Sequence, residues 1–195
     1  MHFLIGLILT ISSFSAMSAE LSLHFNINNL DKKDAHLKVT MESTNPLCAK
    51  VVVGIGGVAI GRRYDFITGN ISVENNILTA SATYETGGFC NYRLSEVYLY
   101  FLNQKNAYFE TRISVLDKAE WAGGGLDYLE ISTNDAQQLS VICEGEKSHS
   151  LSNCVTYNNE KPRARGNAGS FYLWRENIRE FDEYDVATLT FKEGI

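Results

Sequence analysis

Four cysteines are the residues whose chemistry is easiest to predict in this chain: Cys48, Cys90, Cys143 and Cys154. An even number of cysteines in an exported chain favours two disulfides over free thiols. Three pairings are conceivable, and we expect Cys48–Cys90 and Cys143–Cys154 because each pair flanks neighbouring predicted strands. By the chain-entropy argument the first bridge would stabilise the fold by about 4 kcal/mol and the second by about 3 kcal/mol.

A glycine pattern, Gly54, Gly56 and Gly57, follows three valines and matches the turn of a dinucleotide-binding site. Such a site needs a helix that begins at the turn, so that the helix N-terminus can hold the pyrophosphate. The residues that follow include Gly61 and β-branched side chains, which form helices poorly. We therefore interpret these glycines as bulges or close contacts between strands, and we expect no cofactor.

The residue types of metal and catalytic sites are present without the usual spacing. His24 and His36 fall on the polar faces of two predicted strands, and no Cys or carboxylate pattern completes a metal site around them. No nucleophile elbow of the Gly-x-Ser-x-Gly type occurs. Acidic residues gather between Glu176 and Asp185 but lack the spacing of a calcium loop. We assign no metal ligand or catalytic residue and favour a non-enzymatic protein.

Two further groups of residues are candidates for binding. Arg163 and Arg165 lie in the segment 158–166, which we expect to be an exposed polar loop. Arginines donate two hydrogen bonds to a carboxylate, so this loop could dock an acidic partner, although an ordinary mobile loop has the same composition.

Aromatic residues form the second group. Trp121 and Tyr128 flank a run of three glycines, and Tyr98, Tyr100 and Tyr108 share one face of a predicted hairpin. Tyr and Trp dominate recognition surfaces, so we consider Trp121 and Tyr128 as binding residues. Stacked sheets also need aromatic side chains inside, and core packing is the stronger interpretation of the aromatic residues as a whole.

The N-terminus and the charge limit the compartment and the partners. Residues 1–19 contain an apolar run followed by small residues, which predicts a signal peptide cleaved after Ser18 or Ala19, although its first residues lack Lys and Arg. An uncleaved anchor is the alternative. Residues 20–195 would then form a single secreted or periplasmic domain. A net charge of −6 argues against general binding of nucleic acid. No later stretch is long and apolar enough for a membrane helix.

Alternating apolar residues predict the elements that must position these groups. Residues 94–102 and 107–116 should form a central hairpin, and residues 21–27 and 37–41 should pair as a second hairpin. Residues 176–184 could form one short helix. Around ten short strands with turns between them indicate an all-β fold, an antiparallel sandwich or barrel with at most one short helix and two disulfides.

These features together favour an exported binding protein that recognises another macromolecule, such as an inhibitor or an immunity-type protein. Two alternatives stay open. One is a secreted hydrolase or toxin whose site assembles from distant loops, and the other is a structural or adhesive surface subunit. The alternatives predict different structures, because an enzyme needs a deep pocket, a subunit an unpaired apolar strand and a binder a flat aromatic surface.

Overall fold

A computed structural model describes residues 16–54, 57–104, 106–119, 129–131, 139–149, 153–166, 169–179 and 182–194. The strands are β1 (Ala16–Asn28), β2 (Ala35–Ser43), β3 (Lys50–Gly54), β4 (Gly57–Gly61), β5 (Tyr64–Thr68), β6 (Asn70–Glu74), β7 (Ile77–Gly87), β8 (Tyr92–Asn103), β9 (Asn106–Leu116), β10 (Leu129–Glu130), β11 (Leu139–Gly145), β12 (Asn153–Asn158), β13 (Lys161–Gly166), β14 (Gly169–Trp174) and β15 (Asp182–Glu193). Single 3₁₀ turns, η1 (Lys32–Asp34), η2 (Pro46–Cys48) and η4 (Arg175–Asn177), connect some of them.

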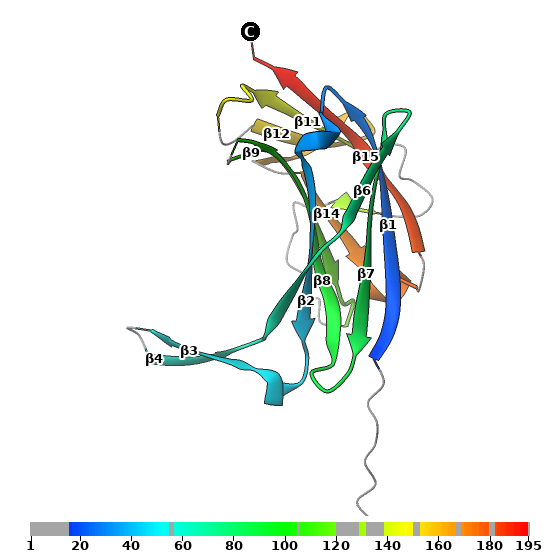
Figure 1. Cartoon of the computed structure of the whole chain (residues 1–195). Helices are drawn as coiled ribbons and strands as arrows, with labels where there is room; N and C mark the ends of the chain where they lie inside the picture. The colour runs from blue at the N-terminus through cyan, green and yellow to red at the C-terminus, as the bar shows by residue number, and fades with distance from the viewer. Residues whose placement is uncertain are drawn as a thin grey trace, which may run out of the picture.

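Thirteen of these strands form one continuous sheet that folds over on itself into two layers (Figure 1). The first layer has the order β5-β2-β8-β9-β14-β10 and the second β6-β7-β1-β15-β11-β12-β13. The end of the β7–β8 hairpin joins the layers, where Gly87 pairs with Tyr92. The all-β prediction is therefore confirmed, with a nearly closed sheet. Most pairs are antiparallel, but β1–β15, β11–β15, β9–β14 and β10–β14 are parallel, so the sheet is mixed.

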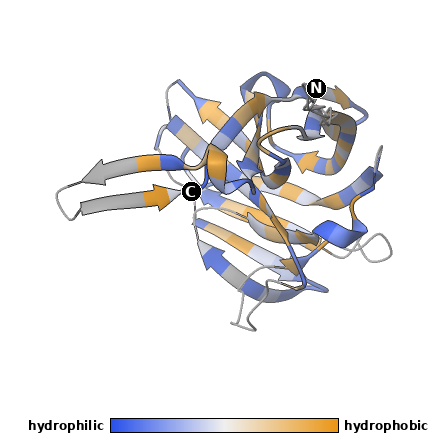
Figure 2. Ribbon diagram, turned by 90° about the horizontal axis from the view of Figure 1, so that it is seen from below, coloured by the Kyte–Doolittle hydropathy of each residue, from blue (hydrophilic) through white to orange (hydrophobic). Residues whose placement is uncertain are grey.

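Alternation of apolar and polar residues explains the two faces of each strand. Figure 2 shows hydrophobic and hydrophilic bands succeeding one another along the strands. On the predicted central hairpin, now β8 and β9, Val97, Leu99, Phe101, Phe109 and Ile113 are at most 1% exposed. The side chains of a strand point alternately to opposite faces, so the residues between them face outward from the core.

Tyr108 departs from the prediction. The pairing of β8 with β9 shifts register, because Phe101 pairs with Phe109 but Leu102 pairs with Ala107, and this bulge leaves Tyr108 as an extra residue on β9. Tyr108 is therefore buried rather than placed beside Tyr98 and Tyr100 on the outer face. Its hydroxyl donates a hydrogen bond to Asp34 Oδ2 at 3.2 Å.

Three predicted local structures are wrong. The strands around residues 21–27 and 37–41 do not pair with each other in the described structure, since β1 lies between β7 and β15 and β2 between β5 and β8. His24 and His36 are therefore not neighbours. The described residues of the segment 176–184 contain no α-helix; they include the end of the turn η4 and the start of β15. The expected polar loop at 158–166 contains an edge strand, β13, which pairs with β12.

Both predicted disulfides are confirmed. Cys48–Cys90 joins η2 to the β7–β8 turn, and Cys143–Cys154 joins residues directly opposite each other on β11 and β12. Residues 1–15 of the predicted signal peptide lie outside the described residues, and β1 begins at Ala16, so the cleavage position stays a prediction. Among the described residues, no helix has the length and apolar character needed to cross a membrane.

Candidate interaction surface

The solvent side of the first layer carries a group of aromatic and cationic side chains from five neighbouring strands. We call this group the outer aromatic face; its members are His36, Lys38, Phe66, Tyr98, Tyr100, Arg112, Tyr172 and Trp174. The register of the strands brings them together, because Lys38 of β2 lies opposite Tyr98 of β8, which lies opposite Arg112 of β9. Thr40 of β2 lies opposite Phe66 of β5.

Local sequence fixes the direction of these side chains. Leu37 and Val39 on β2 are buried in the core, so Lys38 between them must point outward. Phe171 and Leu173 on β14 are buried in the same way and turn Tyr172 and Trp174 to the solvent side. The outer aromatic face is therefore supported from behind by packed core residues.

The centre of the outer aromatic face is a stack of rings. The ring centroids of Tyr98 and Tyr100 lie 4.9 Å apart, and those of Tyr100 and His36 lie 5.4 Å apart, both in stacked orientation. The guanidinium of Arg112 lies 5.1 Å from the Tyr98 ring, and Lys38 Nζ lies 3.9 Å from the Phe66 ring. Such cation–π contacts contribute about 0.5–1 kcal/mol each at exposed sites. They also hold the rings in defined positions.

The β14 side of the face is ordered by similar contacts. Tyr172 and Trp174 meet edge to face at 5.1 Å, and Lys118 Nζ lies 5.5 Å from the Trp174 ring. The Tyr172 hydroxyl donates a hydrogen bond to Glu130 Oε2 at 3.2 Å. Aromatic and polar groups thus alternate across the layer from β5 to β10.

Burial and neighbouring carboxylates raise the pKa values of two tyrosines of the face. Burial, followed by the hydrogen bond and charge of Glu110, raises the pKa of Tyr98 above its ordinary value. Burial and Glu130 raise the pKa of Tyr172 in the same direction. A tyrosine hydroxyl is protonated at physiological pH even at its ordinary pKa, so both hydroxyls are hydrogen-bond donors there. The face can bind by ring contacts and hydrogen bonds.

A partly buried network of charges lies at one end of the same strands. Glu42 of β2 accepts hydrogen bonds from Arg93 Nε and Arg62 Nη1, each at 2.8 Å. Asp117, after β9, accepts from Arg93 Nη1 at 2.6 Å and from Arg175 Nε at 2.7 Å. These five residues line a cavity of about 320 Å³. Because each carboxylate is held by two arginines, we assign the network to holding strand ends together rather than to catalysis.

The residues chosen from sequence do not gather on this face. Arg163 and Arg165 are exposed, but they lie on β13 in the other layer. Trp121 and Tyr128 lie outside the described residues. The four cysteines form structural bridges. Within the part of the chain that the structure describes, no three His, Cys, Asp or Glu side chains are grouped so that they could hold a metal ion.

Sequence reasoning missed Lys38 and Phe66 as members of the face. The alternation in β2 gives the direction of Lys38, but its neighbours come from β5 and β8, far along the chain.

Comparison with known proteins found no matching family model, no similar curated protein and no similar solved structure. The function of the chain is therefore inferred from the chemistry of its surface.

Proposed function

We propose that this chain is an exported, non-enzymatic binding protein that recognises another protein through its outer aromatic face. The observation that carries the proposal is the half-exposed stack of His36, Tyr100 and Tyr98 with Arg112 against its end. Tyr, Trp and Arg are the residues that most often dominate binding energy at protein interfaces.

Order in the free protein supports this role. Binding loses affinity when flexible side chains must be fixed, at about 0.5–1.5 kcal/mol for each long side chain. Tyr98 and Tyr100 already stack on each other, Tyr172 and Trp174 already meet edge to face, and the core fixes their strands. A partner would therefore meet a preorganised surface.

The charges of the face favour a protein partner over nucleic acid. Lys38, Arg112 and Lys118 are balanced by Glu96, Glu110 and Glu130 on the same side of the layer. A nucleic-acid site needs an excess of positive charge, and the whole chain carries −6. The two disulfides are compatible with a secreted or periplasmic location, where the predicted signal peptide would direct the protein.

The experiment isolates the partner and then tests the face. The mature protein is used to purify its partner from the source, and the dissociation constant of the purified pair is measured. Tyr98→Ala should weaken binding by about 30-fold, because the loss of a central interface aromatic costs about 2 kcal/mol. Tyr157→Ala, which removes a half-buried tyrosine from β12 in the other layer, is the matched control.

Thermal melts of both variants separate binding from stability. Equal affinity of the Tyr98→Ala variant and the wild type would overturn the proposal. Loss of binding only on Arg163→Ala with Arg165→Ala would instead place the docking surface on β13.

The alternative of a structural subunit is favoured by a separate observation. The hairpin of β3 and β4 forms a two-stranded sheet of its own and pairs with no other described strand. A strand pair of this kind offers two open edges to another chain.

A further inference from the structure

The β3–β4 hairpin extends away from the body of the protein (Figure 1). Lys50 pairs with Gly61 at its base and Gly54 with Gly57 near its tip. Every residue from 51 to 60 is glycine or apolar, and charged residues, Lys50 and Arg62, stand at the two ends. An isolated two-stranded hairpin is at best marginally stable in water. A hairpin of this composition is therefore expected to be covered by another surface.

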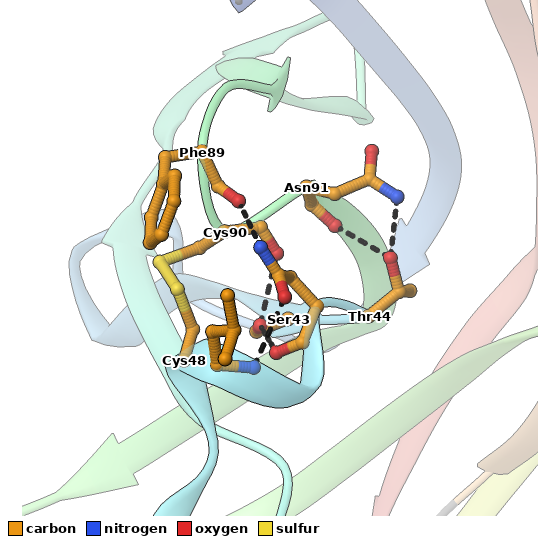
Figure 3. Close-up of a disulfide and its surroundings, with 8 residues drawn as sticks. Ser43, Thr44, Cys48, Phe89, Cys90 and Asn91 are labelled. Atoms are coloured by element: carbon orange, nitrogen blue, oxygen red, sulfur yellow. Dashed lines mark hydrogen bonds between the residues drawn. A yellow bond between two sulfur atoms is a disulfide. The ribbon is translucent and has the colours of Figure 1, made fainter.

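The base of the hairpin is firmly attached. Besides the Cys48–Cys90 bridge, Ser43 Oγ donates a hydrogen bond to the Cys90 carbonyl at 2.9 Å, and Asn45 Nδ2 donates to the Phe89 carbonyl at 2.6 Å (Figure 3). Thr44 Oγ1 donates to the Asn91 carbonyl at 3.1 Å. These contacts tie the segment before β3 to the β7–β8 turn. The hairpin is thus presented from a rigid support.

Large apolar side chains are exposed around this support. Exposed fractions are 81% for Leu47, 58% for Val51, 76% for Ile60, 50% for Tyr64, 57% for Phe66 and 60% for Phe89. Leu47, Tyr64, Phe66 and Phe89 also line a groove of about 770 Å³, together with Lys50, Arg62 and Arg63. Contiguous exposed apolar surface of this kind marks an interaction site.

The edge strand β13 shows how this chain protects an edge of the sheet from further strand pairing. β13, which pairs only with β12 in the described structure, carries Lys161, Pro162, Arg163 and Arg165. Charges and proline on an edge strand prevent other strands from adding to it. β3 and β4 have no such residue between 51 and 60. The chain therefore protects one edge and leaves the hairpin open.

A lipid bilayer cannot supply the hydrogen bonds that the edges of this hairpin lack. Both outer edges of a two-stranded sheet leave backbone N–H and C=O groups unpaired, and each such group costs several kcal/mol in hydrocarbon. A protein groove can supply donors to these edges. Lys50 and Arg63, both exposed, are donors at the groove described above.

The same chain carries both an apolar hairpin and an apolar groove with cationic donors. We propose that the hairpin of one copy docks into this groove of a second copy, and that the second hairpin docks reciprocally. A two-fold dimer needs such a self-complementary surface. The hairpin between Lys50 and Arg62 has no charge. Each chain carries a net charge of −6, so two copies repel each other overall. The docked segment 51–60 adds no charge to this repulsion because it has none.

The exposed apolar side chains set the area that such a dimer can bury. The six exposed side chains represent about 250–450 Å² of apolar area per copy, at about 60–120 Å² for each fully exposed residue. With about 60% apolar area in an interface, a reciprocal contact would bury about 800–1,500 Å² in total. That range reaches the sizes of specific interfaces.

The first measurement is the mass of the mature protein in solution, by light scattering or sedimentation between about 1 and 100 μM. The wild type should be a dimer at the upper end of this range. Val51→Ser with Ile60→Ser should raise the dimer dissociation constant by at least about 100-fold, because four apolar contacts are lost in the pair. Ile77→Ser is the matched control, since Ile77 is also exposed, at 43%, but lies at the β6–β7 turn; this variant should remain dimeric.

The second measurement places the hairpin. Ile60→Cys and Tyr64→Cys chains, made separately with different tags and then mixed under mild oxidation, should form a mixed crosslinked dimer. A monomeric wild type, a dimer unchanged by the hairpin variant, or crosslinks only between two Ile60→Cys chains would each overturn the proposal. Sedimentation of a monomeric wild type with vesicles of anionic and neutral phospholipid would assign the hairpin to lipid instead.

Discussion

Gly69 joins β5 to β6, and we expect Gly69→Ala to lower the free energy of unfolding by about 2–3 kcal/mol. An added Cβ would lie 2.7 Å from the Ser81 carbonyl oxygen and closer still to Leu37 Cδ2. Leu37 is 3% exposed and belongs to the hydrophobic core, and the Ser81 atom belongs to the backbone. Overpacking of this kind costs about 1–3 kcal/mol, and a backbone neighbour favours the upper half of the range. The Gly69 N–H also donates to the Leu37 carbonyl at 3.1 Å.

The assay is denaturant unfolding of the disulfide-intact protein, followed by fluorescence and circular dichroism. A loss of 2–3 kcal/mol corresponds to about a 30- to 150-fold change in the ratio of folded to unfolded protein. Gly61→Ala is the matched control, because its Cβ would meet only the Lys50 carbonyl oxygen at 4.0 Å. That variant should remain within about 0.5 kcal/mol of the wild type. Equal stability of the Gly69→Ala and Gly61→Ala variants would contradict the close approach of Gly69 to Leu37 and Ser81.

Three other changes test the core, the charged network and the tyrosines. Thr111→Val should stabilise the protein by about 1–2 kcal/mol in denaturant melts, because its buried hydroxyl has no hydrogen-bond partner in the described structure; a destabilised variant would reveal a missed bond. Asp117→Asn should lower stability by about 2–4 kcal/mol, since two arginines lose their charged acceptor; an unchanged unfolding midpoint would contradict this. Burial raises the pKa values of Tyr98, Tyr108 and Tyr184 above the ordinary 10.0. Because the unfolded tyrosines lose their protons first, the free energy of unfolding should fall as pH rises above about 10. Melts and tyrosinate absorbance between about pH 9 and 12 should therefore show that ionisation accompanies unfolding. Ionisation of these tyrosines in the folded protein would refute this expectation.

Local sequence was sufficient to predict most strands and the pairing of the β8–β9 hairpin, but not the pairing of strands that lie far apart in the chain. The alternation in residues 94–116 identifies β8 and β9 because the period of two is a property of neighbouring residues. The partners of β1 are β7 and β15, which lie far along the chain, and the β15 pairing is parallel. No local pattern specifies a pairing of that kind. The hairpin predicted for residues 21–27 and 37–41 was wrong for this reason.

Composition misled the interpretation of 158–166. Lysine, proline, arginine and glycine are typical of loops, and the same residues protect an edge strand from further pairing. β13 is such a strand, so its polar sequence hid its structure. The disulfides, in contrast, were predictable because each bridge joins segments that neighbouring strands bring together.

The candidate site could be predicted only in part. The outward direction of Tyr98 and Tyr100 follows from the buried Val97, Leu99 and Phe101. The position of Tyr108 did not follow, because the bulge in the β8–β9 pairing is a tertiary feature. Lys38 reaches Phe66 and lies opposite Tyr98 only after β2 has inserted between β5 and β8.

The two proposed surfaces meet at β5, and this arrangement has a consequence for binding. Phe66 belongs to the outer aromatic face and also lines the groove, so a docked hairpin would cover it. The stack of His36, Tyr98 and Tyr100 lies on β2 and β8, farther from the β5 edge, and would stay open in both copies of a dimer. Two such faces on one dimer could bind a surface that displays many partner molecules, with avidity about 10²- to 10⁴-fold above that of one face. The Val51→Ser, Ile60→Ser variant should therefore keep the affinity of a single face for soluble partner and lose only the avidity for immobilised partner. An equal loss in both formats would mean that the hairpin itself contacts the partner.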